Sequence, residues 1–181
     1  MLKRAILYEA QLRARIIEAS DDPEFKYYPD GYWDYGFEIP KTNHNHQDLV
    51  SVDENENIHG FFRATINRHG HFVSNLSIIA FDKGFTFHKD FRDFVIKLFV
   101  DYKYNKVVFR VAVGSPNEKL YDKFSLKFNG RIVGTFFNDL TTEDGEKLNQ
   151  KYYELSRESF VSTGKNYIKR YTNERKSKSK N

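Results

Sequence analysis

Three runs in the middle of the chain alternate between apolar and polar positions, and short polar turns separate them. The runs cover residues 48–53, 58–66 and 71–81. A period of two places every second side chain on the same face of a strand. The turns "ENEN" and "NRHG" are short and polar, as expected between antiparallel neighbours. The pattern therefore predicts a three-stranded antiparallel meander.

Helical periodicity precedes and follows this meander. Residues 8–20 form one predicted helix, which ends before Pro23 because proline cannot continue it. Residues 89–102 form a second, with apolar positions three and four residues apart on one face. Residues 115–128 form a third, shorter helix. The apolar stripe of the second helix consists of Phe91, Phe94, Val95, Leu98, Phe99 and Tyr102.

Strand patterns return in the last third of the chain, at 106–113, 131–140 and 149–160. The step from 72 to 113 reads strand, helix, strand, and is expected to be a right-handed parallel crossover. The predicted fold class is therefore α+β. It has one mixed central sheet, made of the antiparallel meander, the parallel crossover and C-terminal strands, and helices flank the sheet.

Composition limits the kind of protein. A chain of 181 residues with 17% aromatic residues is long enough for one core-forming domain. It has no cysteine, so disulfides, thiolate zinc sites and thiol nucleophiles are excluded. No apolar run reaches the ~20 residues that cross a bilayer, and no signal peptide is recognisable. We expect a cytoplasmic protein without a membrane partner.

The positive charge is concentrated at the C-terminus. Residues 163–181 hold seven Lys and Arg and one Glu, a net charge of +6, which leaves −2 for the rest of a chain whose total is +4. The domain prediction is accordingly a single folded unit over 1–162 and a basic, disordered tail over 163–181. The simple interpretation is that this tail is solvated, and the alternative is that it binds nucleic acid weakly.

Two short segments and the order of the elements carry a family resemblance. "NEKLYDKF" surrounds Tyr121, and "YYELSRESF" ends the last predicted strand. Together with the element order over 48–160, they resemble the GNAT superfamily of N-acetyltransferases. The sequence of these segments most resembles that of divergent GNAT-like proteins of low-GC Gram-positive bacteria and their phages. The resemblance implies a GNAT fold and binding of acetyl-CoA or another acyl-CoA.

The resemblance also implies where the acyl donor binds. Backbone groups at Ile79, Ala80 and Phe81 would hold the pantetheine, where the third meander strand and the crossover strand splay apart. The family's glycine-rich pyrophosphate loop aligns with "TFHKDF", which places Phe87, His88, Lys89 and Asp90 in the cofactor site. Phenylalanines stand where the family has small residues, and these do not allow the close approach that glycine permits. A helix N-terminus with His88 and Lys89 nearby still offers an anion site. Alternatively, Lys89 is solvated and Phe87 closes the core.

For catalysis, the resemblance implies that Tyr121 is the general acid that protonates the departing thiolate. The alternative is a packed core tyrosine. The family's Asn at the cofactor site is Gly114 here, and Asn117, three residues later, is predicted to substitute for it in part. No general base is evident in 71–81, where Asn75 and Ser77 could orient a water.

The aromatic loop between 24 and 48 is long enough to be a binding loop. Tyr32, Trp33 and Tyr35 are predicted to line the substrate pocket, and Glu38 is a candidate base; packing under the loop is the alternative. No metal site is predicted, because two nearby histidines in a polar loop lack a third ligand.

Two functional hypotheses from different classes follow. The first is an acyl-CoA-dependent N-acyltransferase that moves an acetyl group to a primary amine by direct attack. The second is a catalytically inactive GNAT-like binding or assembly module encoded by a phage, favoured by the missing glycines and the missing base. The acceptor amine and the oligomeric state are left open by the sequence.

Overall fold

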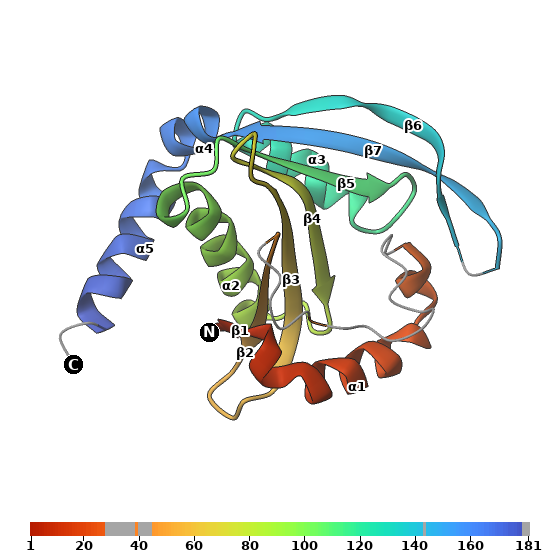
Figure 1. Cartoon of the computed structure of the whole chain (residues 1–181), viewed down its shortest axis with the longest axis horizontal. Helices are drawn as coiled ribbons and strands as arrows, with labels where there is room; N and C mark the ends of the chain where they lie inside the picture. The colour runs from red at the N-terminus through yellow and green to blue at the C-terminus, as the bar shows by residue number, and fades with distance from the viewer. Residues whose placement is uncertain (28–38, 40–44, 143, 179–181) are drawn as a thin grey trace.

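A computed structural model describes residues 1–27, 39, 45–142 and 144–178 of the chain. Its centre is a seven-stranded mixed sheet with the order β1-β2-β3-β4-β5-β7-β6 (Figure 1). Neighbouring strands are antiparallel except β4 and β5, which are parallel. The strands are β1 Leu2–Arg4, β2 His46–Val52, β3 Ile58–Asn67, β4 Phe72–Ala80, β5 Lys106–Ala112, β6 Arg131–Thr141 and β7 Lys147–Ser156. The predicted meander, parallel crossover and mixed sheet are thereby confirmed.

Helices flank this sheet on both faces, as predicted. Two short 3-10 helices, η1 and η2, enclose α1 near the N-terminus, and a π-helical turn, η3, continues α2. The bounds are η1 Ala5–Tyr8, α1 Glu9–Ser20, η2 Pro23–Tyr27, α2 Phe85–Ile96, η3 Lys97–Asp101, α3 Glu118–Lys127, α4 Arg157–Thr163 and α5 Lys165–Lys178. Within the described ranges, no helix combines the length and apolar character needed to cross a bilayer.

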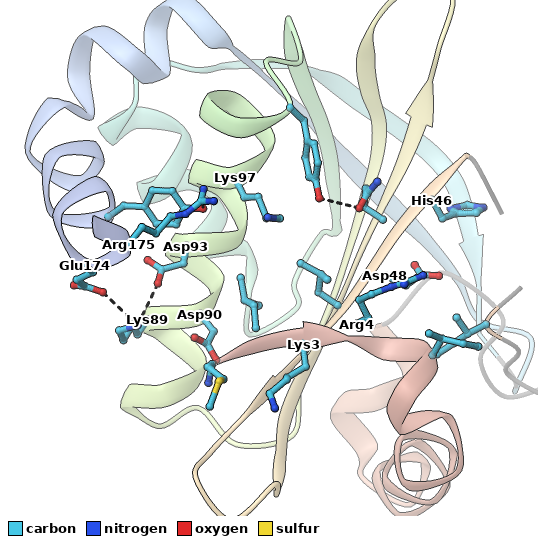
Figure 2. A pocket seen from close by; sticks show the side chains of 18 residues that line it. Lys3, Arg4, His46, Asp48, Lys89, Asp90, Asp93, Lys97, Glu174 and Arg175 are labelled. Carbon is cyan, nitrogen blue, oxygen red and sulfur yellow. Dashed lines mark hydrogen bonds and ion pairs between the residues drawn. The ribbon is translucent and has the colours of Figure 1, made fainter. Parts of the chain in front are cut away.

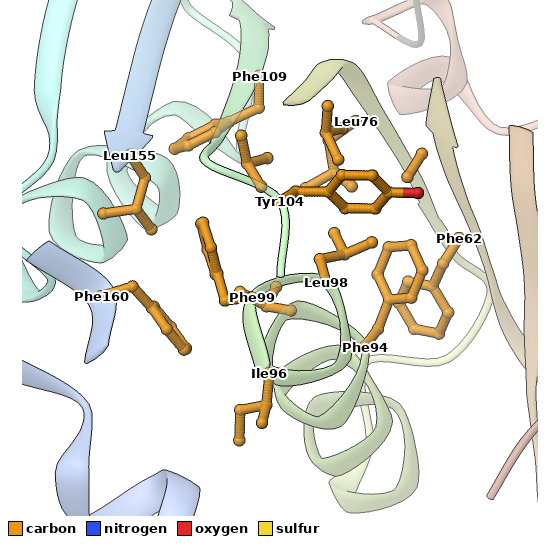
Figure 3. Packing of buried hydrophobic residues seen from close by; sticks show 14 of the residues in the cluster. Phe62, Leu76, Phe94, Ile96, Leu98, Phe99, Tyr104, Phe109, Leu155 and Phe160 are labelled. Carbon is orange, nitrogen blue, oxygen red and sulfur yellow. The ribbon is translucent and has the colours of Figure 1, made fainter. Parts of the chain in front are cut away.

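The core consists of two clusters on opposite faces of the sheet. Phe61 packs with α1 in the smaller cluster, whereas its neighbour Phe62 packs with α2 in the larger one. Both faces of β3 are thus buried at this point, which explains why two apolar residues stand side by side within its otherwise alternating pattern. In the larger cluster the rings of Phe62 and Phe94 lie 5.2 Å apart between centroids, and those of Phe99 and Phe160 4.7 Å apart (Figure 3). The predicted apolar stripe of α2 and η3 faces this cluster.

Several boundaries differ from the prediction, each for a local reason. Strand β1, three residues long, was not predicted, because so short a run shows no periodicity. Helix α2 begins at Phe85, four residues earlier than predicted, with Gly84 as its N-cap. Strand β7 ends at Ser156, whose side chain accepts a hydrogen bond from the Ser159 N–H at 3.1 Å and starts α4.

The predicted disorder of residues 163–181 is wrong for the described part of that segment, because Lys165–Lys178 form α5. Helix α5 packs beside α2, and Tyr171 is only 9% exposed. The hydroxyl of Tyr171 donates to Asp101 at 2.8 Å, and Arg175 pairs with the same carboxylate at 2.6 Å. Tertiary contacts therefore hold a segment that is too polar to predict as folded from its composition.

Candidate functional site

Strands β4 and β5 are neighbours in the sheet, yet they separate along their length. Within these two fully described strands they pair at one point only, Val73 with Val107. Beyond that point β4 stays paired with β3 as far as Ala80, while β5 follows β7 as far as Ala112. The strands therefore diverge toward their carboxyl ends and leave a gap in the sheet (Figure 1).

The backbone of β4 directs polar groups into this gap. The Phe81 N–H donates to the His59 carbonyl of β3 at 3.0 Å. Because backbone groups of successive strand residues point to opposite sides, Phe81 and Ile79 face β3 while Ile78 and Ala80 face the gap. Of the predicted pantetheine-binding residues, Ala80 is placed at the gap by its backbone. The backbone of Ile78 also faces the gap, whereas that of Ile79 faces β3.

A cavity of about 80 Å³ lies between β4, α2 and α3, at the carboxyl end of this gap. It brings together five of the predicted site residues, which come from three separate segments of the chain. These are Ala80, Phe87, His88, Asn117 and Tyr121. Ile78, Lys83, Phe91 and Leu120 complete the lining.

Tyr121 is held in place from two strands. Its ring lies 5.6 Å from that of Phe109 on β5 and 6.3 Å from that of Tyr153 on β7, measured between centroids. Helix α3 is also tied to β7 by polar contacts at the next residue. The Tyr153 hydroxyl donates to Asp122 at 2.8 Å, and Lys151 pairs with Asp122 at 3.2 Å. This arrangement orients the helix that carries Tyr121.

These contacts shift the pKa values of three groups. The hydrogen bond from Tyr153 and the ammonium of Lys151 lower the pKa of Asp122, although burial opposes them. Burial, together with the bond to Asp122, raises the pKa of Tyr153. Lys151 also pairs with Glu118 and, by a hydrogen bond to that carboxylate, lowers the pKa of Glu118. Asp122 and Glu118 are therefore ionised and Tyr153 neutral around pH 7, and they form a structural anchor next to Tyr121.

The loop before α2 is held by a carboxylate. Asp82 accepts a hydrogen bond from the Gly84 N–H at 2.8 Å, and its other oxygen lies 2.9 Å from Nδ1 of His59. The contact with His59 and the Gly84 N–H lower the pKa of Asp82. The first intrahelical bond runs from the His88 N–H to the Gly84 carbonyl at 3.2 Å. The amides of the three residues between them are the donors that a helix N-terminus presents to an anion.

Five of the predicted cofactor residues either are packed in the core or lie away from the cavity. Phe87 lines the cavity, but its side chain is 5% exposed and stacks on Phe62 with centroids 5.5 Å apart. Ile79 and Phe81 pack toward α1 on the opposite face of the sheet. Lys89 and Asp90 lie on the far side of α2 from Tyr121, because one residue step rotates a side chain by ~100° about a helix.

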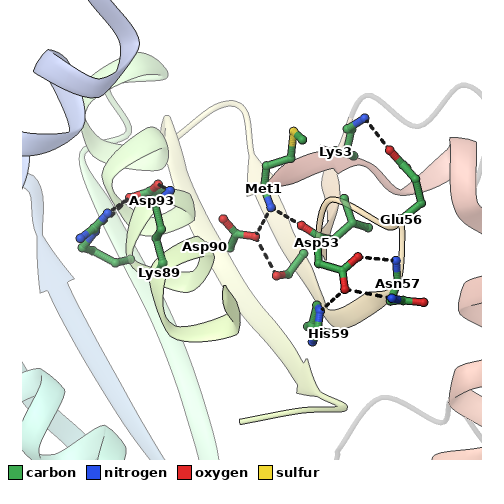
Figure 4. A network of polar contacts seen from close by, with 12 residues as sticks. Met1, Lys3, Asp53, Glu56, Asn57, His59, Lys89, Asp90 and Asp93 are labelled. Carbon is green, nitrogen blue, oxygen red and sulfur yellow. Dashed lines mark hydrogen bonds and ion pairs between the residues drawn. The ribbon is translucent and has the colours of Figure 1, made fainter. Parts of the chain in front are cut away.

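Lys89 and Asp90 instead line a larger pocket of about 700 Å³ among β1, β2, α2 and α5 (Figure 2). Lys89 pairs with Asp93 at 3.2 Å and with Glu174 at 3.5 Å. Asp90 is 2% exposed and contacts Ser51 at 2.7 Å and the N-terminal amine of Met1 at 2.9 Å (Figure 4). The lining residues come from both ends of the chain, and no sequence motif predicted this pocket. Its carboxylates are paired with cations, which suits a structural role.

The remaining predicted residues are either packed or outside the described ranges. The Asn75 amide donates to the Ser77 hydroxyl at 3.2 Å, and neither side chain titrates near neutrality, so no base is found at this place. Tyr32, Trp33, Tyr35 and Glu38 lie outside the described residues. Among residues 1–27, 39, 45–142 and 144–178 there is no cluster of three His, Cys, Asp or Glu suited to a metal ion.

Comparison with known proteins identifies the fold. No protein-family profile matches the sequence. No curated protein sequence matches it either. Among solved structures, a spermidine N-acetyltransferase from Vibrio cholerae in complex with CoA and spermine is similar, with a TM-score of 0.69 and 14% identity, covering 89% of this chain and 97% of that one.

Two chimeras of the V. cholerae enzyme and hSSAT are also similar. One has a TM-score of 0.61 at 15% identity and covers 83% of this chain and 94% of that chain. The other has a TM-score of 0.56 at 17% identity and covers 66% of this chain and 72% of that chain. The chain therefore has the GNAT fold, as predicted. At such identities the likeness establishes the fold and leaves the activity to be argued from the site.

Proposed function

We propose that the chain is an acyl-CoA-dependent N-acyltransferase that transfers an acetyl group to a primary amine. The observation that carries this proposal is the gap between β4 and β5 with Tyr121 and Asn117 at its carboxyl end. The backbone groups of Ile78 and Ala80 point into the gap, where they can pair with the amides of a pantetheine arm. An extended arm added there completes the hydrogen bonding that a neighbouring strand would otherwise supply.

In the proposed reaction the acceptor amine attacks the thioester carbonyl carbon directly. The carbon–sulfur bond breaks, and the thiolate takes the proton of the Tyr121 hydroxyl. The attacking nitrogen loses a proton to water, and Tyr121 regains one from water, so the products are an amide and a free thiol. Glu38 stays a predicted base for the nitrogen proton.

The helix N-terminus gives partial support for the phosphate end of the donor. The free amides at the start of α2 and the exposed side chain of His88 suit an anion. Phe87, however, occupies the position of a family glycine and is packed against Phe62, so the loop does not form the usual backbone cradle. This observation favours the second hypothesis, a binding or assembly module without catalysis.

The test is an acetyl-transfer assay on the full chain with millimolar acetyl-CoA. Spermidine and spermine are the first acceptors to try, because structural neighbours carry those names, and a lysine-containing peptide is the next. Free thiol and acetylated amine should form in equal amounts. Binding of CoA without either product for any acceptor would favour the binding module, and the absence of both binding and product would refute the acyltransferase.

A further inference from the structure

His59 on β3 lies between two carboxylates that belong to different loops of the chain. Its Nδ1 lies 2.9 Å from Asp82, in the loop between β4 and α2. Its Nε2 lies 3.3 Å from Asp53, in the turn between β2 and β3 (Figure 4). The Nε2 atom is buried and, among the described residues, has no hydrogen-bond partner beyond this ion-pair contact. The ring therefore connects the turn at one end of the meander with the loop that begins α2.

The two contacts need two N–H donors, and an imidazole has both only when it is protonated. In the neutral ring one nitrogen carries a lone pair, which a carboxylate oxygen repels. Both carboxylates are held in the ionised form. The pKa of Asp53 is lowered to about 2, chiefly by hydrogen bonds from Asn57, and the contact with His59 is the main cause that lowers the pKa of Asp82. The two carboxylates thus suit an imidazolium ring better than a neutral one.

The other charged groups around the ring are directed elsewhere. Arg15 of α1 and Glu56 of the turn line a pocket of about 570 Å³ next to His59. Arg15 pairs with Glu18 on its own helix. Glu56 pairs with Lys3 of β1 at 3.3 Å. In this part of the described chain, the two carboxylates at the ring nitrogens are therefore the groups that respond most directly to the charge of His59.

The same residue also holds the loop before α2 through its backbone. The His59 carbonyl accepts the N–H of Phe81 at 3.0 Å and that of Asp82 at 3.1 Å. The second oxygen of Asp82 accepts the Gly84 N–H at 2.8 Å, and Gly84 is the N-cap of α2. A carboxylate fixed next to a helix N-terminus repels an anion there unless a nearby positive charge neutralises it.

We propose that His59 is a positioning residue for the loop before α2, and that its protonated ring neutralises Asp82 and admits an anion to the helix N-terminus. When the ring loses its proton, it keeps one N–H and no charge, so Asp82 is no longer neutralised. Binding of the phosphates of the acyl donor then weakens as the pH rises from ~6 to ~8, the interval in which imidazoles lose their proton. This inference rests on the proposed function for its ligand, whereas the coupling of His59 to the loop does not.

The first test needs no ligand. It follows the ring signals of His59 and the amide signal of Gly84 by NMR in the isotope-labelled full chain, between about pH 5.5 and 8.5. We expect the Gly84 amide to titrate with the same midpoint as the His59 ring, and to stop titrating over this range in His59→Gln. Asp82→Asn keeps an oxygen acceptor for that amide but removes the charge, and it should also abolish the titration. A Gly84 amide that titrates in His59→Gln, or that does not titrate in the wild type, would overturn the inference.

The second test measures the binding of CoA and of inorganic pyrophosphate by calorimetry at about pH 6 and about pH 8. Over this interval the wild type should lose about two- to fivefold more affinity for each probe than His59→Gln does, the effect of one charge several Å from a phosphate. Titration of the probes themselves is common to all variants and cancels in this comparison. His88→Gln is the matched control, since His88 is an exposed histidine at the start of the same helix, and it should retain the part of the pH dependence that His59→Gln loses.

Equal pH dependence in the wild type and in His59→Gln, or no binding of either probe at either pH, would contradict the role of His59. A wild type that binds pyrophosphate with the expected pH dependence, but neither binds CoA nor transfers acetyl, would support the role of His59 and refute the acyltransferase.

Discussion

The docking of α5 is the feature of the fold that departs most from the sequence, and Tyr171 is the residue on which it depends. An aromatic side chain buries ~150–250 Å², and at ~25 cal/mol per Å² this amounts to roughly 4–6 kcal/mol for a fully buried ring. That figure is an upper estimate, because the unfolded chain already buries some of this surface. With Tyr171 only 9% exposed, we expect Tyr171→Ala to lower the free energy of unfolding by ~3–5 kcal/mol.

A second variant separates the ring from its hydroxyl. Tyr171→Phe keeps the packing but removes the hydrogen bond to Asp101, which retains Arg175 at 2.6 Å. The expected loss is ~1.5–3 kcal/mol, the net value of one hydrogen bond to a charged group. Burial raises the pKa of Tyr171 to about 12. Since the folded pKa is above the unfolded one, this contribution is complete below the unfolded value of ~10 and is lost as the pH rises toward 12.

Urea unfolding followed by far-ultraviolet circular dichroism measures both variants. Arg170→Ala is the matched control on the exposed face of α5, and it should stay within ~0.5 kcal/mol of the wild type. If Tyr171→Ala cost less than ~1 kcal/mol, residues 165–178 would behave as a detached tail, and the account of α5 as part of the fold would be refuted.

Three further predictions concern the site and its support. Tyr121→Phe should slow acetyl transfer ~10²–10⁴-fold at saturating substrates, as expected for loss of a general acid. The midpoint of thermal unfolding should stay nearly unchanged, because the packing of the ring is kept. An unaltered rate would remove Tyr121 from the mechanism. Gly60→Ala should lower the free energy of unfolding in urea by ~1–3 kcal/mol, because an added Cβ would meet the Phe87 ring at 2.5 Å. An unchanged free energy of unfolding would mean that this ring moves aside without cost. Because the pKa of Asp122 is lowered in the folded protein, its contribution to the free energy of unfolding is complete above the unfolded pKa of ~3.9 and is lost as the pH falls. Lys151→Met should reduce this loss of stability in acid. An unchanged dependence of stability on pH would contradict the structural anchor around Asp122.

Much of the fold was predictable because its elements show strong periodicity. The alternating runs of β2, β3 and β4 and the apolar stripe of α2 follow directly from burial on defined faces. Helix α5 was not predictable, because its fold depends on one buried tyrosine and a carboxylate 70 residues away at Asp101. No local pattern records such a contact. Strand β1 was not predictable either, because its three residues form a strand only by pairing with β2.

The candidate site was predictable in part. Tyr121, Asn117, Ala80, Phe87 and His88 do line one cavity, which the element order alone made plausible. Lys89 and Asp90, which were predicted beside them, line the other pocket, because the rotation of α2 about its axis could not be read from the sequence. Beginning the helix four residues earlier adds about one turn and leaves each side chain on the same side of the helix. Neighbouring residues, however, point in different directions, so residues adjacent to His88 in the sequence do not share its pocket.

The most direct test of the central claim is to map CoA binding on the isotope-labelled chain by amide chemical-shift changes. The account predicts saturable shifts at Ile78, Ala80, Asn117 and Leu120, with residues of the charged pocket such as Asp93 unchanged. No shifts at millimolar CoA, or shifts confined to that charged pocket, would contradict the claim that the gap between β4 and β5 is the donor site.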